Sequence, residues 1–91
     1  MSHTIRDKAK LMARVRRLKG QVEAVERALD QEIGCADVLQ LAASIRGAVN
    51  GLVAELVEDH LRMHVVDPSL GQQERERGAD ELVEVVRTYF R

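Results

Sequence analysis

Bulky aromatic side chains are almost absent from this 91-residue chain, which has no tryptophan, one tyrosine and one phenylalanine. Aromatic residues supply much of the buried area in small cores. The apolar content here is instead leucine, valine and alanine, which suit seams between helices. A chain of this length buries only about 60% of the surface of its unfolded form. We therefore expect one domain spanning residues 1–91, stabilised by assembly into an oligomer.

Cysteine and long apolar runs are also scarce. Cys35 is the one cysteine, so no internal disulfide can form, and a reducing compartment is the natural setting. No apolar run approaches the roughly 18–20 residues of a membrane span, and the charged N-terminus lacks the apolar core of a signal peptide. These features predict a soluble, cytoplasmic protein with no membrane partner.

The net charge of −1 hides an uneven distribution along the chain. Residues 1–19 carry seven basic residues against one acidic residue, a net of +6, whereas residues 20–91 have a net of −7. A basic end on an acid-rich body is typical of proteins that present one surface to a polyanion.

The first helix is predicted between the charged N-terminus and Gly34. Thr4 and Asp7 are spaced as in a capping box, with Asp in place of Glu, and are expected to open it. The helix should end near Asp30, where Gly34 supplies the break. Its apolar residues alternate four and three apart in one seam: Leu11, Val15, Leu18, Val22, Val25 and Leu29.

A second, longer helix is predicted from Cys35 to about Val66. The dipeptide Asn50-Gly51 and nearby Gly47 favour turns, yet the apolar period continues through them, so we expect one unbroken helix. Two apolar stripes imply two packing partners, namely the first helix and another surface. The first stripe is Val38, Leu41, Ile45, Ala48, Leu52 and Leu56, and the second is Leu39, Ala42, Val49, Val53 and Val57.

A turn at residues 67–71, which includes Pro68 and Gly71, separates the second helix from a third. No segment alternates with the period of a β-strand, so the expected fold class is all-α, with three helices in each protomer. The third helix carries Ala79, Leu82, Val83, Val86 and Phe90.

Three candidate metal ligands share one side of the second helix. At about 100° per residue, His60 and His64 fall roughly 20° on either side of the line on which Cys35 lies. Along the axis the histidines are about 37 and 43 Å from Cys35, at 1.5 Å per residue. One chain therefore cannot bring the thiol to the imidazoles while the helix is continuous.

An antiparallel second copy can complete the site. With a two-fold axis near Ala48 and Val49, Cys35 of one chain faces His60 and His64 of the other, and the second apolar stripe is buried between them. Gly47 and Gly51 then lie where the two backbones cross most closely, and the lack of a side chain at these positions would allow that close approach. A symmetric dimer would carry two such sites, and a thiolate with imidazoles suits cobalt, nickel or zinc.

Other interpretations of these residues remain open. A single cysteine near a helix N-terminus is often a small apolar residue, and histidines four apart also occur by chance on surfaces. Ser2 is small, so removal of Met1 would leave a free amine beside His3, and this arm would either add ligands or be a solvated tail.

A basic stripe on the first helix is the candidate DNA contact. Its members, spaced four, four and three apart, are Arg6, Lys10, Arg14 and Arg17. Such a stripe can bind phosphates in a salt-dependent way, although a solvated helix face would have the same pattern. No helix-turn-helix, zinc-finger or basic-zipper motif is present, so recognition would rest on a broad basic surface and on DNA shape. Arg46 lies close to the proposed axis and should lean toward water, an acidic partner or DNA.

These residues, together with RVRRLKGQ at 14–21 and AASIRGAVNGL at 42–52, resemble the CsoR/RcnR/FrmR family of helical repressors over essentially the whole chain. The resemblance implies a three-helix protomer, an antiparallel four-helix dimer and usually a dimer of dimers. The opening MSHTIRDK looks like the nickel- and cobalt-responsive RcnR branch, whereas RVRR is similar to the formaldehyde-responsive FrmR branch.

The ligand pattern distinguishes the branches that the resemblance brings in. The RcnR-like set is matched by His3, Cys35, His60 and His64, with the N-terminal amine also implicated. Copper and persulfide sensors need a second cysteine, which this chain lacks. Formaldehyde sensors react through an N-terminal proline, where this chain has Ser2, and have an acidic residue where it has His64.

The resemblance thus implies a repressor that binds operator DNA when metal-free and leaves it when nickel or cobalt binds, with zinc as a further possibility. It would control its own operon and a metal exporter, and its DNA-facing residues would be Lys10, Arg14, Arg17 and Arg46. A formaldehyde-responsive repressor is the alternative.

An enzyme has little support because no Gly-rich loop or nucleophile–base set is present, and a coiled-coil adaptor would leave the aligned histidines and cysteine unexplained.

Overall fold

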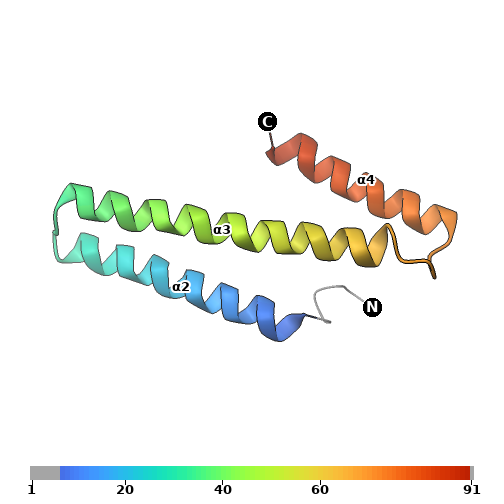
Figure 1. The fold of residues 1–91 in the computed structure, drawn as a ribbon. Coiled ribbons are helices and arrows are strands. Elements are labelled where there is room, and N and C mark those ends of the chain that lie inside the picture. The colour runs from blue at the N-terminus through green and yellow to red at the C-terminus, as the bar shows by residue number, and fades with distance from the viewer. Residues whose placement is uncertain (1–6, 91) are drawn as a thin grey trace. The chain divides into compact units, whose positions relative to one another are not determined.

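The computed structural model describes residues 7–90, and within that range it contains three helices and no strand. The helices are α2 (Lys8–Asp30), α3 (Cys35–His64) and α4 (Gln72–Tyr89), shown in Figure 1. The all-α, three-helix prediction is therefore confirmed. The described chain divides into two compact units, Asp7–Val53 and the residues from Ala54 onward, and the boundary between them falls within α3. None of the described helices is long and apolar enough to cross a membrane.

The start of α2 differs from the prediction. Asp7 is itself the N-cap residue, and its side chain makes no capping hydrogen bond. A capping box opened by Thr4 would instead place Asp7 inside the first turn. That prediction is therefore wrong for Asp7, while Thr4 lies outside the described residues.

The end of α2 falls at Asp30, as predicted, but Gly34 does not provide the left-handed residue. Glu32 does, with φ of 54°, while the N–H of Ile33 donates to the carbonyl of Ala28 at 3.1 Å. This six-to-one bond, with the one from Glu32 to Leu29, is the Schellman pattern of helix termination. The Gly34 carbonyl instead accepts the first backbone bonds of α3. The predicted end of the helix near Asp30 is therefore confirmed, but the prediction that Gly34 supplies the break is wrong.

In the unit Asp7–Val53, α2 and the first part of α3 run antiparallel side by side (Figure 1). The predicted seam on α2 separates into two stripes. Leu11 is buried, and Leu18 and Val25 are half-buried. The other stripe remains exposed, with Val15 at 42%, Val22 at 52% and Leu29 at 60%. Spacing of seven residues is the period by which helices pair, so this stripe offers a second apolar face.

The second predicted helix is continuous, because α3 passes through Gly47, Asn50 and Gly51 without a break. It ends at His64, two residues before the predicted end. Every member of its first apolar stripe is half-buried. The members from Val38 to Leu52 lie in the same unit as α2. In the second stripe Leu39 is 67% exposed and Val49 is 36% exposed. This part of the stripe is therefore not buried by other residues of the unit Asp7–Val53.

A tight turn leads from α3 to α4. The N–H of Leu70 donates to the carbonyl of Asp67 at 3.1 Å, and Arg75 donates from Nε to Leu70 and from Nη2 to Asp67 through their carbonyls. The predicted turn is confirmed. Because Arg75 belongs to α4, these bonds tie the turn to the first coils of that helix.

Helix α4 begins after Gly71, whose N–H donates to the carboxylate of Glu74 at 3.1 Å. It folds back over the last turns of α3, in the unit that starts at Ala54 (Figure 1). Phe90, expected inside this helix, is the residue that caps its end. Its apolar side is half-buried at Ala79 and Leu82 and then becomes exposed toward the C-terminal end.

Candidate metal centre and nucleic-acid interface

The last turn of α3 brings two imidazoles together. His60 and His64 are four residues apart, and their ring centroids are 5.0 Å apart with the planes tilted by 37°. Side chains at this spacing share a helix face. Metal–nitrogen bonds of about 2.0–2.1 Å allow one ion to bridge two rings at such a separation. The pairing that the sequence predicted for these two histidines is therefore present.

Helix α4 holds one of the two rings in place. The Nε2 atom of His60 lies 2.9 Å from the carbonyl oxygen of Gly78, and a carbonyl can only accept, so Nε2 carries the proton in this bond. A carboxylate oxygen of Glu81 lies 3.9 Å from the same nitrogen. The other ring nitrogen, Nδ1, is then the one that can offer a lone pair to a metal.

Sequence reasoning missed Gly78 and Glu81. They lie 18 and 21 positions after His60 on another helix, and no spacing rule relates residues across a turn of uncertain geometry. The one available indication was Gly78 itself, a glycine inside a helical pattern, which often marks a close backbone approach.

Cys35 lies apart from the histidine pair. It is the first residue of α3, it is exposed, and it is a free thiol. The unbroken helix separates it from His60 by 25 residues, about 37 Å at 1.5 Å per residue. No group of three potential metal-binding side chains comes together among residues 7–90. His3 lies outside the described residues.

The donor types nevertheless suit a transition metal. One thiol and two imidazoles are the ligands that cobalt, nickel and zinc accept, whereas hard cations prefer oxygen. A second chain in the antiparallel arrangement is needed to bring Cys35 to the imidazoles. That arrangement stays a prediction, and the exposed stripes of α2 and α3 are the apolar surface available for it.

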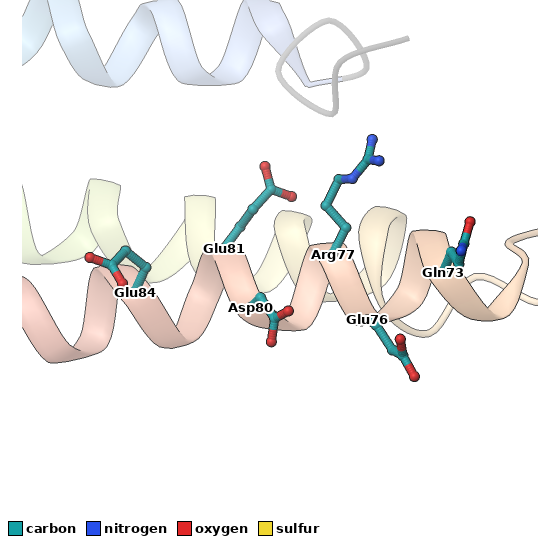
Figure 2. Close-up of a pocket in the computed structure, with 6 residues that line it drawn as sticks. All are labelled: Gln73, Glu76, Arg77, Asp80, Glu81 and Glu84. Carbon is teal, nitrogen blue, oxygen red and sulfur yellow. The ribbon is translucent and has the colours of Figure 1, made fainter.

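A shallow pocket on α4 has a different chemistry. Figure 2 shows its lining, in which Arg77 and Glu81 point to one side of the helix and Glu76 and Asp80 to the other. All the lining residues come from α4 and are exposed: Gln73, Glu76, Arg77, Asp80, Glu81 and Glu84. It contains no thiol or imidazole, so it does not provide the donor set of the candidate metal centre.

The four predicted DNA-facing residues belong to one unit, Asp7–Val53. Lys10 and Arg17 are exposed on α2, and Arg46 is exposed on α3. Arg14 differs, because it is half-buried and its guanidinium lies next to Gly51 of α3. The basic surface is therefore partly anchored at Arg14 and open to solvent at the other three positions.

Comparisons with known proteins agree with this architecture. The family described as "Metal-sensitive transcriptional repressor" matches residues 7–88. The chain is 50% identical to a Serratia marcescens protein described as "Uncharacterized protein in bioA 5'region" and 47% identical to Transcriptional repressor RcnR of Salmonella paratyphi B, with each match covering 100% of both chains. A glutamate-to-histidine variant of the Formaldehyde-Responsive Regulator FrmR from Salmonella enterica serovar Typhimurium has a similar structure, with a TM-score of 0.87 and 42% identity, covering 97% of this chain and 99% of that one.

The three-helix fold, the basic surface of the unit Asp7–Val53 and these matches define a small all-helical regulator of transcription. More particularly, the chain belongs to the metal-sensitive transcriptional repressor family. Its members are repressors and not enzymes, and membership implies that the chain binds operator DNA as an oligomer and responds to an effector. The family resemblance seen in the sequence is thereby confirmed.

Proposed function

We propose that residues 1–91 act as one cytoplasmic domain that represses a metal-efflux operon and leaves its operator when nickel or cobalt binds. The observation that carries this proposal is the pairing of His60 with His64, whose ring centroids are 5.0 Å apart, on the same helix as Cys35. A thiolate and two imidazoles from an antiparallel pair of chains form a set of soft and borderline donors. His3 and the N-terminal amine would add ligands from the arm, and zinc would fit the same donors.

The relatives support a metal effector. Several proteins matching along their full length bear the name Transcriptional repressor RcnR, including the 47% identical protein of Salmonella paratyphi B and a 46% identical protein of Escherichia coli. The lack of a second cysteine argues against a copper or persulfide sensor of this family.

Operator binding would use the basic surface of the unit Asp7–Val53. Lys10, Arg14 and Arg17 lie on successive turns of α2, and Arg46 adds a charge from α3. In an oligomer these groups would repeat and contact several phosphates at once. Metal binding at the far part of α3 would alter the arrangement of the helices and lower the affinity for the operator, a coupling typically of about 1–3 kcal/mol per effector.

Formaldehyde is the second candidate effector, and the structural neighbour is the observation that favours it. That neighbour is named a formaldehyde-responsive regulator. It carries a histidine in place of a glutamate, however, and this chain has a histidine at position 64 without any such change. Ser2 also offers a primary amine instead of the proline expected of that branch.

Operator release tests the proposal. Fluorescence anisotropy of labelled DNA from upstream of the protein's own gene would be measured during separate titrations with cobalt chloride, nickel chloride and formaldehyde. We expect either metal to release the DNA at low concentration and formaldehyde to act weakly. Full release by formaldehyde with no effect of either metal would overturn the metal assignment.

A further inference from the structure

Gly78 is the one buried residue of α4, and it lies directly against the backbone of His64. A Cβ added to Gly78 would collide with the His64 carbonyl group, coming within 2.7 Å of its carbon, and would be 3.1 Å from the His64 Cβ. The obstructing atoms are backbone, so no side-chain rotation can relieve the clash. This close approach of the two helices therefore requires glycine.

The same residue also contacts the other histidine. The carbonyl oxygen of Gly78 accepts a hydrogen bond from His60 Nε2 at 2.9 Å, in a partly buried setting. Gly78 thus contacts both members of the histidine pair. Because it has no side chain it lies against the backbone of His64, and its carbonyl oxygen accepts the hydrogen bond from His60.

A small displacement would break this arrangement. Moving the His64 carbonyl carbon from 2.7 Å to an ordinary contact of 3.4 Å requires a shift of 0.7 Å, and the His64 carbonyl oxygen, which lies closer still to the added Cβ, requires a larger one. Applied along the His60 bond, even a shift of 0.7 Å would lengthen 2.9 Å to 3.6 Å, which is no longer a hydrogen bond. His60 Nε2 would then lose its hydrogen bond to the Gly78 carbonyl.

We propose that Gly78 is a positioning residue for the effector site, which allows α4 to seat on His64 and thereby holds the His60 ring with the proton on Nε2 and the lone pair on Nδ1. This inference rests on the proposed function, because it takes the histidine pair as effector ligands. Groups that orient a metal-binding histidine typically change metal affinity about 10- to 100-fold when they are lost. Gly78 acts through His60 and does not touch the effector.

The experiment compares Gly78→Ala with Gly20→Ala in the full-length oligomer. Gly20 is also inside a helix, and a Cβ there meets nothing within 4 Å, so the control makes the same chemical change in open space. Long-range proton–nitrogen NMR of the metal-free proteins reports which ring nitrogen of His60 is protonated. Titration with cobalt chloride, followed by its visible absorption, reports affinity.

We expect His60 of the wild type and of Gly20→Ala to be the Nε2-protonated tautomer, and cobalt affinity to be equal in both. In Gly78→Ala we expect a mixture of tautomers and cobalt affinity lower by about 10- to 100-fold. An unchanged His60 tautomer with unchanged cobalt affinity in a folded Gly78→Ala would overturn the proposal.

Two further outcomes are decisive as well. If Gly78→Ala fails to fold, the wild-type spectrum decides, because a predominant Nδ1-protonated His60 would refute the proposed seating. If the wild type binds no cobalt while only Gly78→Ala loses the Nε2-protonated form, the metal function is refuted and the seating of His60 by Gly78 is supported.

Discussion

The guanidinium of Arg14 on α2 occupies space beside Gly51 on α3, where an added Cβ would come within 3.0 Å of its Nη1 atom. Arg14 is half-buried at this point, whereas Lys10 and Arg17 on the same helix are exposed. A basic residue held against a neighbouring helix keeps less rotational freedom than one in solvent, so it loses less entropy when it meets a phosphate. Arg14 and Arg17 should therefore contribute to DNA binding in different ways.

The first prediction concerns these two arginines. Arg14→Ala and Arg17→Ala should each weaken operator binding and reduce the slope of log affinity against log salt by about one unit per lost phosphate contact. Arg14→Ala should also lower the melting temperature, because its side chain packs against α3. Arg62→Ala is the control, since Arg62 is an exposed partner of Glu58 and belongs to the other unit of the chain. Unchanged salt slopes in folded variants would remove α2 from the DNA interface.

The second prediction tests whether the metal centre is shared between chains. Cys35→Ala chains and chains with both His60→Ala and His64→Ala should each fail to bind cobalt tightly. Mixed dimers should regain about one site, because one arrangement of intact ligands survives in each heterodimer. Cobalt absorption of purified, differently tagged heterodimers measures this. Heterodimers that form without binding cobalt would contradict the antiparallel site.

The third prediction places the two-fold axis. In the single chain a Cβ at Gly47 meets nothing within 4 Å, as at Gly20, so replacing either glycine by alanine should favour its helix by up to about 1 kcal/mol. If two α3 helices cross beside Gly47, however, the added methyl group lies between their backbones. We expect sedimentation equilibrium to show weaker dimerisation for Gly47→Ala and unchanged dimerisation for Gly20→Ala. Equal dimerisation of both would move the axis elsewhere.

Much of the helical framework was predictable because it depends on local periodicity. The unbroken passage of α3 through Gly47 and Gly51 followed from apolar spacing, and the turn after α3 followed from its turn-forming residues. The ends of the helices were less predictable. The left-handed position at Glu32 depends on the Schellman bonds, and a non-glycine residue there costs about 1–2 kcal/mol, which local preference alone would not choose.

The candidate site was predictable only in part, for a related reason. Pairing of His60 with His64 is a property of one helix, so their spacing of four was sufficient. The bond from His60 to Gly78 depends on how closely α4 packs against α3, which no sequence pattern specifies. The division of the α2 seam into covered and exposed stripes likewise depends on tertiary packing.

The fourth prediction concerns acid stability of the turn before α4. The Ser69 backbone N–H donates to Asp67 at 2.9 Å and the Ser69 hydroxyl at 2.8 Å, and these bonds, with the nearby charge of Arg75, hold the pKa of Asp67 below its ordinary 3.8. A depressed pKa means that the carboxylate stabilises the fold above the unfolded pKa and that this contribution is lost as the pH falls through the folded value.

Asp67→Asn keeps a hydrogen-bond acceptor but removes the titrating charge. Its urea-unfolding midpoint should be lower than that of the wild type by a constant amount above about pH 5, and the gap should shrink below about pH 4. Circular dichroism during urea unfolding, between pH 2 and 7, gives both curves. A gap that is independent of pH down to pH 2 would show that the carboxylate charge contributes nothing at this turn.

The last prediction separates metal from aldehyde through His64. Formaldehyde chemistry needs the Cys35 thiol near a nucleophilic amine, and His64 is not required for it. Metal chemistry needs the imidazole, because a carboxylate is a poorer ligand for nickel or cobalt. His64→Glu should therefore raise the nickel and cobalt concentrations needed for operator release at least about tenfold. It should leave metal-free operator affinity intact, because His64 and the basic residues belong to different units of the chain.

Anisotropy of the labelled operator measures both quantities in one titration. His60→Gln serves as a second ligand variant and should impair metal release in the same direction, whereas Arg62→Ala, two residues before His64, should respond like the wild type. A His64→Glu protein that still releases DNA at wild-type metal concentrations would exclude His64 as a ligand. If the same protein became fully responsive to formaldehyde, the residue at position 64 would be identified as the one that selects between the two effectors within this fold.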